Sequence, residues 1–214
     1  MSLRDKLKQI DRLHGQIHKS PAAGADCPQP LARLLPGAEA TGRRGEYWLH
    51  RTRYPLTHAH GLFCLKDLLS APPELLSYAA RQRTEERIDA RRLVFFDTET
   101  TGLSGGVGST AFMIGLGYFD DEHFRIDQYF MRQFSDEPAM LDELIEALTS
   151  AHTRRGALVS YNGASFDLPL IHNRAVINRA GTVPQDLPHI DLLHIVRRIW
   201  KKHVSDCSLG TVEE

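Results

Sequence analysis

The chain has 214 residues, of which 42% are hydrophobic and 25% charged, and its formal net charge is −1. This balance is ordinary for a globular protein, and the net charge does not by itself indicate a nucleic-acid partner. No apolar run approaches the roughly 18 residues of a membrane-spanning helix, so we expect no membrane association. The cysteines Cys27, Cys64 and Cys207 are few and widely spaced, which disfavours a disulfide framework and favours a cytoplasmic location.

The first 90 residues are predicted to form an N-terminal extension. Residues 1–19 carry apolar side chains at helical spacing, which predicts an amphipathic helix that docks on the main domain or on an unknown protein partner. The Pro-, Ala- and Gly-rich residues 20–44 predict a linker. Residues 45–90 are predicted to form a small irregular lobe that ends, from residue 81 onward, in a polar, helix-prone lead-in segment.

Residues 91–214 have the pattern of an α/β domain. Short apolar runs predict five strands, at residues 93–96, 111–119, 124–134, 157–161 and 187–190. Helices are predicted from Pro138 onward and at residues 166–179 and 192–202, and Asp191 is placed to cap the last of them. The order predicts a mixed five-stranded sheet flanked by helices, with three antiparallel strands first.

Two carboxylates follow the first of these strands at alternate positions. Asp97 and Glu99 belong to the sequence DTETTGL, and side chains at i and i+2 of a strand leave on the same face, roughly 6.6 Å apart. Carboxylates placed this way can converge on two divalent cations, and Mg²⁺ and Mn²⁺ prefer oxygen ligands. A DxE sequence after a strand is, however, more often a helix cap or a surface ion pair.

A second motif strengthens the metal-site interpretation. The sequence NGASFD, residues 162–167, follows another buried strand and opens a helix. Gly163 permits a tight turn, Phe166 can anchor the loop, and Asp167 is expected at the same edge of the sheet as Asp97 and Glu99. Taken alone, Asp167 would be an acidic residue favoured by the helix dipole.

These residues resemble the motifs of a known family. DTETTGL at residues 97–103 and NGASFD at residues 162–167 are similar to the first two motifs of the DEDD-type 3′→5′ exonucleases of the ribonuclease-H-like superfamily. The segments GLSGGVGSTAF, DQYFMRQFSDE and SYNGASFDLPL resemble the bacterial YprB-like branch of that superfamily. The likeness extends over residues 93–214 and, more weakly, over residues 54–63.

The resemblance implies roles for named residues. Asp97, Glu99 and Asp167 would bind two Mg²⁺ or Mn²⁺ ions and would be the catalytic residues of phosphodiester hydrolysis, acting on single-stranded DNA or RNA. Backbone amides of the glycine-rich loop would approach the terminal nucleotide. The residues expected to contact substrate are Thr98, Thr100, Thr101, Gly102, Leu103, Asn162 and Phe166.

One part of the family pattern is missing. DEDD enzymes have a fourth carboxylate preceded by a His or Tyr base, and the sequence up to Glu214 contains no such motif. Asp191 suits a helix cap better than a metal ligand, and the nearby histidines fit surface positions better than a catalytic base. We therefore expect a chain that lacks the last helix of the domain and has impaired activity.

Two other functions remain compatible with the sequence. The first is a catalytically silent nucleic-acid-binding or scaffolding protein of the same fold. The second is an endonuclease of that fold, which the form of the second motif disfavours. Two basic clusters could contact phosphates, although mixed-charge helix faces are the commoner explanation. They consist of Arg81, Arg83, Arg87, Arg91 and Arg92, and of Arg197, Arg198, Lys201 and Lys202.

Overall fold

The computed structural model describes residues 35–81, 87–102, 109–154 and 156–213. The expected N-terminal helix, most of the expected linker and part of the lead-in segment lie outside these ranges. The fold described below is that of residues 37–214, whose described part forms one compact unit. Among the described residues, no helix is both long and apolar enough to cross a membrane.

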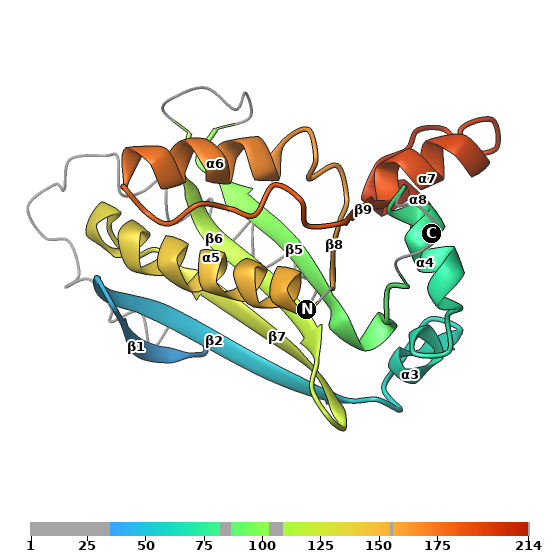
Figure 1. Ribbon diagram of the computed structural model, residues 1–214, viewed down its shortest axis with the longest axis horizontal. Coiled ribbons are helices and arrows are strands. Elements are labelled where there is room, and N and C mark those ends of the chain that lie inside the picture. The colour runs from blue at the N-terminus through green and yellow to red at the C-terminus, as the bar shows by residue number, and fades with distance from the viewer. Residues whose placement is uncertain (1–34, 82–86, 103–108, 155, 214) are drawn as a thin grey trace, which may run out of the picture. The chain divides into compact units, whose positions relative to one another are not determined.

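One mixed sheet organises the fold, and α5 and α6 lie across one of its faces (Figure 1). Its strand order is β1-β2-β7-β6-β5-β8-β9. The neighbours β5, β8 and β9 run parallel, and the other pairs are antiparallel. The seven strands are β1 (Ala38–Gly42), β2 (Gly45–Pro55), β5 (Leu93–Thr100), β6 (Ala111–Phe119), β7 (His123–Phe130), β8 (Ala157–Ser160) and β9 (His189–Asp191).

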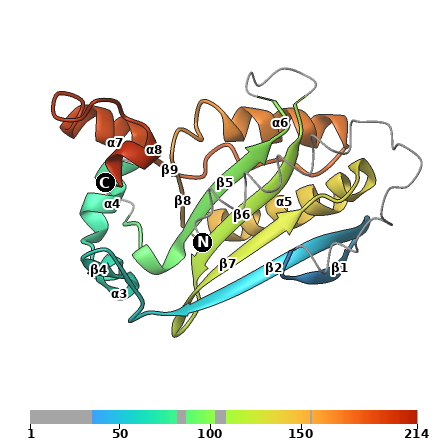
Figure 2. The same ribbon diagram turned by 180° about the vertical axis from the view of Figure 1, so that it is seen from behind.

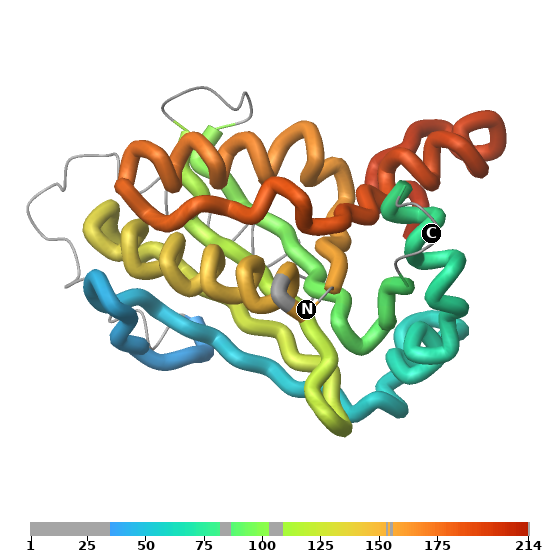
Figure 3. Tube along the Cα trace, viewed as in Figure 1, coloured from blue at the N-terminus to red at the C-terminus, as the bar shows by residue number. Residues whose placement is uncertain are grey.

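The remaining elements connect and cover this sheet. From β2 the chain passes through a small separate hairpin and two short helices before it enters β5 (Figure 3). These connecting elements are β3 (Ala59–His60), β4 (Phe63–Cys64), α3 (Leu65–Leu68), α4 (Pro73–Ala79) and the 3₁₀ helix η1 (Ala90–Arg92). The later elements are η2 (Phe134–Asp136), α5 (Glu137–Thr153), α6 (Asp167–Ile177), α7 (Leu192–Ile199) and α8 (Leu209–Val212).

The main core lies between the sheet and the helices α5 and α6. Side chains alternate along β5, so Val94 and Phe96 point into this core, where they pack with residues such as Leu144 and Ile171. A second, smaller cluster covers the opposite face at the parallel end of the sheet. It joins Leu93 of β5 to residues of α4, β8 and β9. Figure 2 shows the sheet from this side, with α5 and α6 behind it.

The predicted α/β class and the element order after residue 93 are confirmed, but the strand count is wrong. Residues 38–42, expected to end the linker, form β1, and residues 45–55, expected in an irregular lobe, form β2. Both strands extend the main sheet beyond β7, giving seven strands rather than five. β2 lacks the alternation of apolar and polar residues by which a strand is recognised. Its Arg51 lies opposite the fully buried Asp127 of β7 and binds it. The cationic residue compensates an acid that the sheet buries.

The predicted helix boundaries are approximately correct. Pro138 lies in the first turn of α5, and Asp191 caps α7 by accepting a hydrogen bond from the backbone N–H of Leu193 at 3.1 Å. The strand expected at residues 124–134 ends at Phe130, and η2 follows it. The lead-in segment ends in the 3₁₀ helix η1.

Candidate active site

Asp97 and Glu99 lie near the carboxyl end of β5, as expected. They project from the face opposite the α5 and α6 core, because Val94 and Phe96 occupy the core face. Asp97 is exposed and Glu99 is half-buried, whereas Thr98 between them is buried. The strand pairing shifts register between Glu99 and Thr100, directly after the two acids. A β-bulge of this kind re-aims side chains at the end of a strand.

Asp167 is the first residue of α6 and is buried. Its carboxylate accepts a hydrogen bond from the hydroxyl of Thr98, which connects the start of α6 to the middle of the Asp97–Glu99 segment. Two motifs that lie about 65 residues apart in sequence therefore meet at one edge of the sheet. Thr98, expected to contact substrate, is instead a buried side chain that orients Asp167.

The pKa values of both aspartates are raised in this arrangement. Burial raises the pKa of Asp97, and the neighbouring carboxylate of Asp167 raises it further, whereas a backbone hydrogen bond from Thr98 lowers it. Burial also raises the pKa of Asp167, although its hydrogen bond from the Thr98 hydroxyl opposes this shift. Asp97 is solvent-accessible, yet the surrounding protein removes enough water to penalise its charge.

The loop between β8 and α6 is held by side chains from β8 and β9. Asp191 accepts hydrogen bonds from the backbone N–H groups of Asn162 at 2.9 Å and of Ala164 at 3.1 Å. Asn162 has a φ of 67°, in the left-handed region that Asn tolerates. The oxygens of Asp191 are thus engaged with backbone donors, which makes it a loop clamp in addition to a helix cap. Sequence reasoning found the cap but not the clamp, because the clamped residues lie 27 and 29 positions away.

Gly163 is required by close packing in this loop. A Cβ at this position would lie 2.4 Å from the Ser160 Oγ, 2.7 Å from the Ser160 Cβ and 3.3 Å from the Asp167 Oδ2. The first two distances are shorter than real contacts, so a side chain would displace Ser160 or move the loop. Either shift would disturb Asp167, which the same loop positions.

We expect Gly163→Ala to lower the free energy of unfolding by about 1–3 kcal/mol, as overpacked sites do. Urea unfolding of the variant and the parent chain measures this difference. Gly210→Ala is the matched control, because a Cβ at Gly210 meets nothing within 4 Å. Equal unfolding midpoints for Gly163→Ala and the control would show that the loop accommodates a methyl group.

Ser160 and His189 form a second support beneath the loop. The Ser160 Oγ accepts a hydrogen bond from the Gly163 N–H at 3.1 Å and lies 2.8 Å from the His189 Nε2. Burial lowers the pKa of His189, the Asp191 carboxylate opposes this shift, and His194 adds to it. His189 is therefore neutral in the fold at pH 7, and its Nε2 shares a hydrogen bond with the Ser160 hydroxyl.

We expect this histidine to make the fold less stable in acid. An unfolded histidine binds a proton below about pH 6.5, whereas folded His189 resists protonation until a lower pH. Stability from this group is complete above pH 6.5 and is lost as the pH falls toward the folded pKa. Urea unfolding at pH 7.5 and pH 5.5 should show a larger loss for the parent chain than for His189→Gln. Equal losses would contradict this assignment.

The other residues expected to contact substrate lie around the same edge. The Thr100 hydroxyl donates to the carbonyl of Gly102 at 3.0 Å, and the Thr101 N–H donates to the carbonyl of Thr110 at 3.0 Å. These two threonines therefore close the base of the loop that follows β5. Asn162 is exposed and Phe166 is half-buried at the start of α6. Leu103 and most of the loop from Gly102 to Thr110, which is expected to supply backbone amides, lie outside the described residues.

The expected metal ligands Asp97, Glu99 and Asp167 lie at the same edge of the sheet, but their carboxylates do not converge on one position. Across the described part of the chain, no three His, Cys, Asp or Glu side chains form a group that could hold a metal ion. Repulsion between Asp97 and Asp167, together with the Thr98 hydrogen bond, opposes closer convergence. The donor chemistry nevertheless fits Mg²⁺ or Mn²⁺, since the candidate ligands are carboxylate oxygens. A divalent cation would also favour the ionised forms that burial disfavours.

Comparison with known proteins agrees with this fold. Residues 94–214, more than half of the chain, match the family model of the RNase_H superfamily, and the chain belongs to that family. It is also 33% identical over 177 residues to the uncharacterized protein YprB of Bacillus subtilis (strain 168). That alignment covers 79% of this chain and 40% of the YprB sequence. Members of the superfamily are typically nucleases.

Proposed function

We propose that this chain is a metal-dependent nuclease that shortens single-stranded nucleic acid from its 3′ end. The observation that carries the proposal is the meeting of Asp97 and Asp167 at one edge of the sheet, with raised pKa values and with Thr98 joining their elements. Titratable groups shifted by burial and by one another are more frequent at functional sites than elsewhere. Membership of a superfamily of nucleases supports the same assignment.

In this proposal, Asp97, Glu99 and Asp167 hold two Mg²⁺ or Mn²⁺ ions. When bound, such ions activate the attacking water and stabilise the leaving oxygen of a phosphodiester. The protein itself positions the carboxylate ligands. Thr98 orients Asp167, and the loop clamped by Asp191 fixes the start of α6. Asn162 is exposed beside these groups and is available to a nucleotide.

Cationic side chains near the loop suit a nucleic-acid substrate. The hydroxyl of Tyr161, the residue before Asn162, donates to the carbonyl of Cys207. This bond places the loop next to a small hollow whose lining includes Arg197 and Lys201 of the C-terminal segment. Phosphates of a strand that enters the acidic edge would meet these cations, which supply sequence-independent affinity.

The second candidate function is nucleic-acid binding without cleavage. It is favoured by the arrangement of the carboxylates, which form no metal-holding group in the described residues, and by the commitment of Asp191 to backbone donors. For the same reason, we propose that any activity of this chain is slow. The two candidates differ in one measurable event, the metal-dependent release of mononucleotides.

The test uses single-stranded DNA and RNA labelled at the 5′ end, incubated with the chain in Mn²⁺, in Mg²⁺ or in EDTA. We expect a slow ladder that shortens from the 3′ end in Mn²⁺ and is absent in EDTA. A circular single strand in a parallel reaction should stay intact. Cutting of the circle would assign an endonuclease instead. Retention of either polymer in a filter-binding assay without any shortening would establish the binding protein and refute the nuclease.

A further inference from the structure

A pocket lies between α5 and the sheet, at the end where β5 begins. Its volume is about 320 Å³, within the range of roughly 300–1,000 Å³ that small-molecule sites occupy. Val94 lines it from the core face of β5, whereas Asp97 projects from the opposite face three positions further on, roughly 10 Å along the strand. The pocket is therefore separate from the candidate active site.

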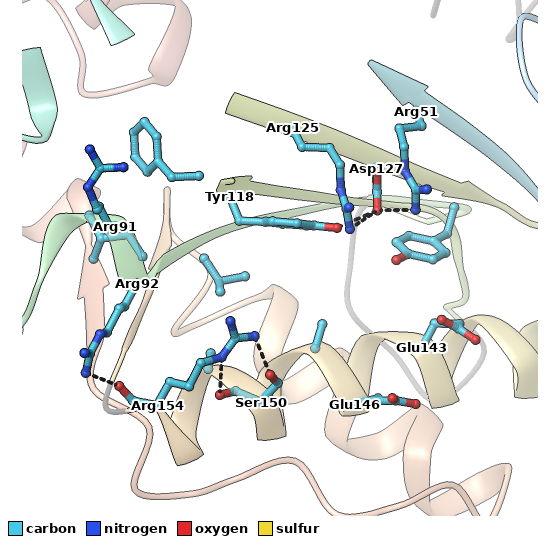
Figure 4. Close-up of a pocket in the computed structure, with 16 residues that line it drawn as sticks. Arg51, Arg91, Arg92, Tyr118, Arg125, Asp127, Glu143, Glu146, Ser150 and Arg154 are labelled. Carbon is cyan, nitrogen blue, oxygen red and sulfur yellow. Dashed lines mark hydrogen bonds and ion pairs between the residues drawn. The ribbon is translucent and has the colours of Figure 1, made fainter. Parts of the chain in front are cut away.

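Arginines from four parts of the chain surround this pocket (Figure 4). Three acidic side chains, Asp127, Glu143 and Glu146, also line it. The arginines are Arg51 of β2, Arg125 of β7, Arg91 and Arg92 of η1, and Arg154, which follows the last residue of α5. The lining thus carries five cationic groups and three carboxylates.

Arg51 and Arg125 share a single carboxylate. Asp127 accepts two hydrogen bonds from Arg51, at 2.7 Å and 3.0 Å, and its Oδ2 lies 3.2 Å from Arg125. The buried Nε–H of Arg125 has no acceptor among the described residues. The single carboxylate of Asp127 therefore neutralises only one of the two guanidinium groups, which leaves a net positive charge at this part of the pocket wall. Buried donors without an acceptor are rare in folded proteins and call for a partner.

Arg154 adds a further cation at the same pocket. Its guanidinium donates to the hydroxyl and to the carbonyl of Ser150, and Arg92 donates to the Arg154 carbonyl at 2.7 Å. These acceptors are neutral, and no carboxylate of the described residues lies within 4.0 Å of the Arg154 guanidinium. Cations at a helix C-terminus offset the helix dipole, but a dipole end carries only a partial charge and leaves most of the cationic charge in place.

Glu143 and Glu146 of α5 lie toward the end of the pocket away from Arg154, on the side where Asp127 and Arg51 lie across from them on the sheet (Figure 4). Glu146 and Glu143 precede Arg154 by 8 and 11 residues, which corresponds to roughly 12 Å and 16 Å along the helix axis. A ligand of mononucleotide length can therefore place an anionic group against Arg154 and hydrogen-bond donors against the glutamates. Inorganic anions are too short to use both ends.

We propose that this pocket binds a phosphomonoester of mononucleotide size. Its phosphate contacts Arg125 and Arg154, since guanidinium groups match phosphate oxygens in charge and in geometry. Its hydroxyl or amino groups point toward Glu143 and Glu146. The proposal does not depend on the nuclease assignment, because none of the pocket residues belongs to the candidate active site.

Calorimetric titration in EDTA tests the proposal with three ligands, a nucleoside 5′-monophosphate, the same nucleoside without phosphate, and inorganic phosphate. We expect the monophosphate to bind, inorganic phosphate to bind more weakly and the nucleoside not to bind. Arg154→Gln should weaken monophosphate binding by about tenfold or more, as loss of a charge-assisted contact does. Arg53→Gln is the matched control, since Arg53 is exposed on β2 outside the pocket.

Three outcomes would overturn the proposal: no binding of the monophosphate at millimolar concentration, equal binding of the nucleoside, or equal affinity in Arg154→Gln and Arg53→Gln. Arg125→Gln provides a second variant, used with its melting temperature to verify folding. Asp97→Asn must retain the parent affinity, because loss of binding there would place the ligand in the candidate active site. The nuclease assay can fail while all these binding results hold.

Discussion

Asp97→Asn is expected to lower the nuclease activity strongly and to stabilise the fold. The change removes one carboxylate from the acidic edge while preserving its size. By analogy with the removal of other catalytic groups, the rate of mononucleotide release should fall by about 10³-fold or more. The assay is the 3′-shortening of a labelled single strand in Mn²⁺.

The stabilisation follows from the sign of the pKa shift. Unfolded Asp97 loses its proton near pH 3.9, whereas burial and Asp167 raise the pKa of the folded residue. The folded state thus becomes less stable as the pH rises from about 4 through the folded pKa, and the penalty is complete above the folded pKa. In EDTA at pH 7.5, Asp97→Asn should therefore melt at a higher temperature than the parent chain. At pH 4 the difference should shrink.

Metal addition gives the same prediction a further test. Mn²⁺ should raise the melting temperature of the parent chain by mass action, and it should raise that of Asp97→Asn much less. Asp121→Asn, on the exposed turn between β6 and β7, is the matched control and should leave the rate and the Mn²⁺ response unchanged. If Asp97→Asn melts below the parent chain in EDTA, or retains its nuclease rate, the acidic edge is a structural feature and not a catalytic one.

The part of the site that follows from local sequence was predictable. A buried strand that ends in an acid fixes which face Asp97 and Glu99 share, because side chains alternate along a strand. A glycine-containing turn before a helix places Asp167 at the same edge. Position along a strand does not, however, determine how far apart the carboxyl groups lie. That distance depends on the Thr98 hydrogen bond and on repulsion between the acids, which are tertiary effects.

The part of the fold that was missed depends on partners distant in sequence. β2 contains His50, Arg51 and Arg53, whose polar side chains suggest an exposed segment rather than an inner strand. Its position becomes clear only from its pairing with β7, where Arg51 meets Asp127 across 76 residues. A strand that uses a charge to compensate a buried acid does not show the alternation by which strands are recognised.

Asp127→Asn tests whether that charge holds the added strands in the sheet. Asp127 is fully buried, and it accepts hydrogen bonds from Arg51 and from the Tyr118 hydroxyl, the latter at 2.7 Å. The substitution keeps the shape of the side chain but leaves Arg51 and Arg125 without their common counter-charge. We expect it to lower the free energy of unfolding by about 3–5 kcal/mol, the cost of breaking a buried ion pair from one side.

Urea unfolding measures this loss, and Asp120→Asn is the matched control. Asp120 faces Arg53 at 3.8 Å in a more exposed ion pair, so its substitution should cost less than about 1 kcal/mol. Adding Arg51→Gln to Asp127→Asn should cost less than the sum of the two single changes, because both remove the same interaction. A loss below about 1 kcal/mol for Asp127→Asn would mean that the ladder between β2 and β7 does not need this charge. Backbone pairing and the packing of Tyr47 in the main core would then suffice to extend the sheet.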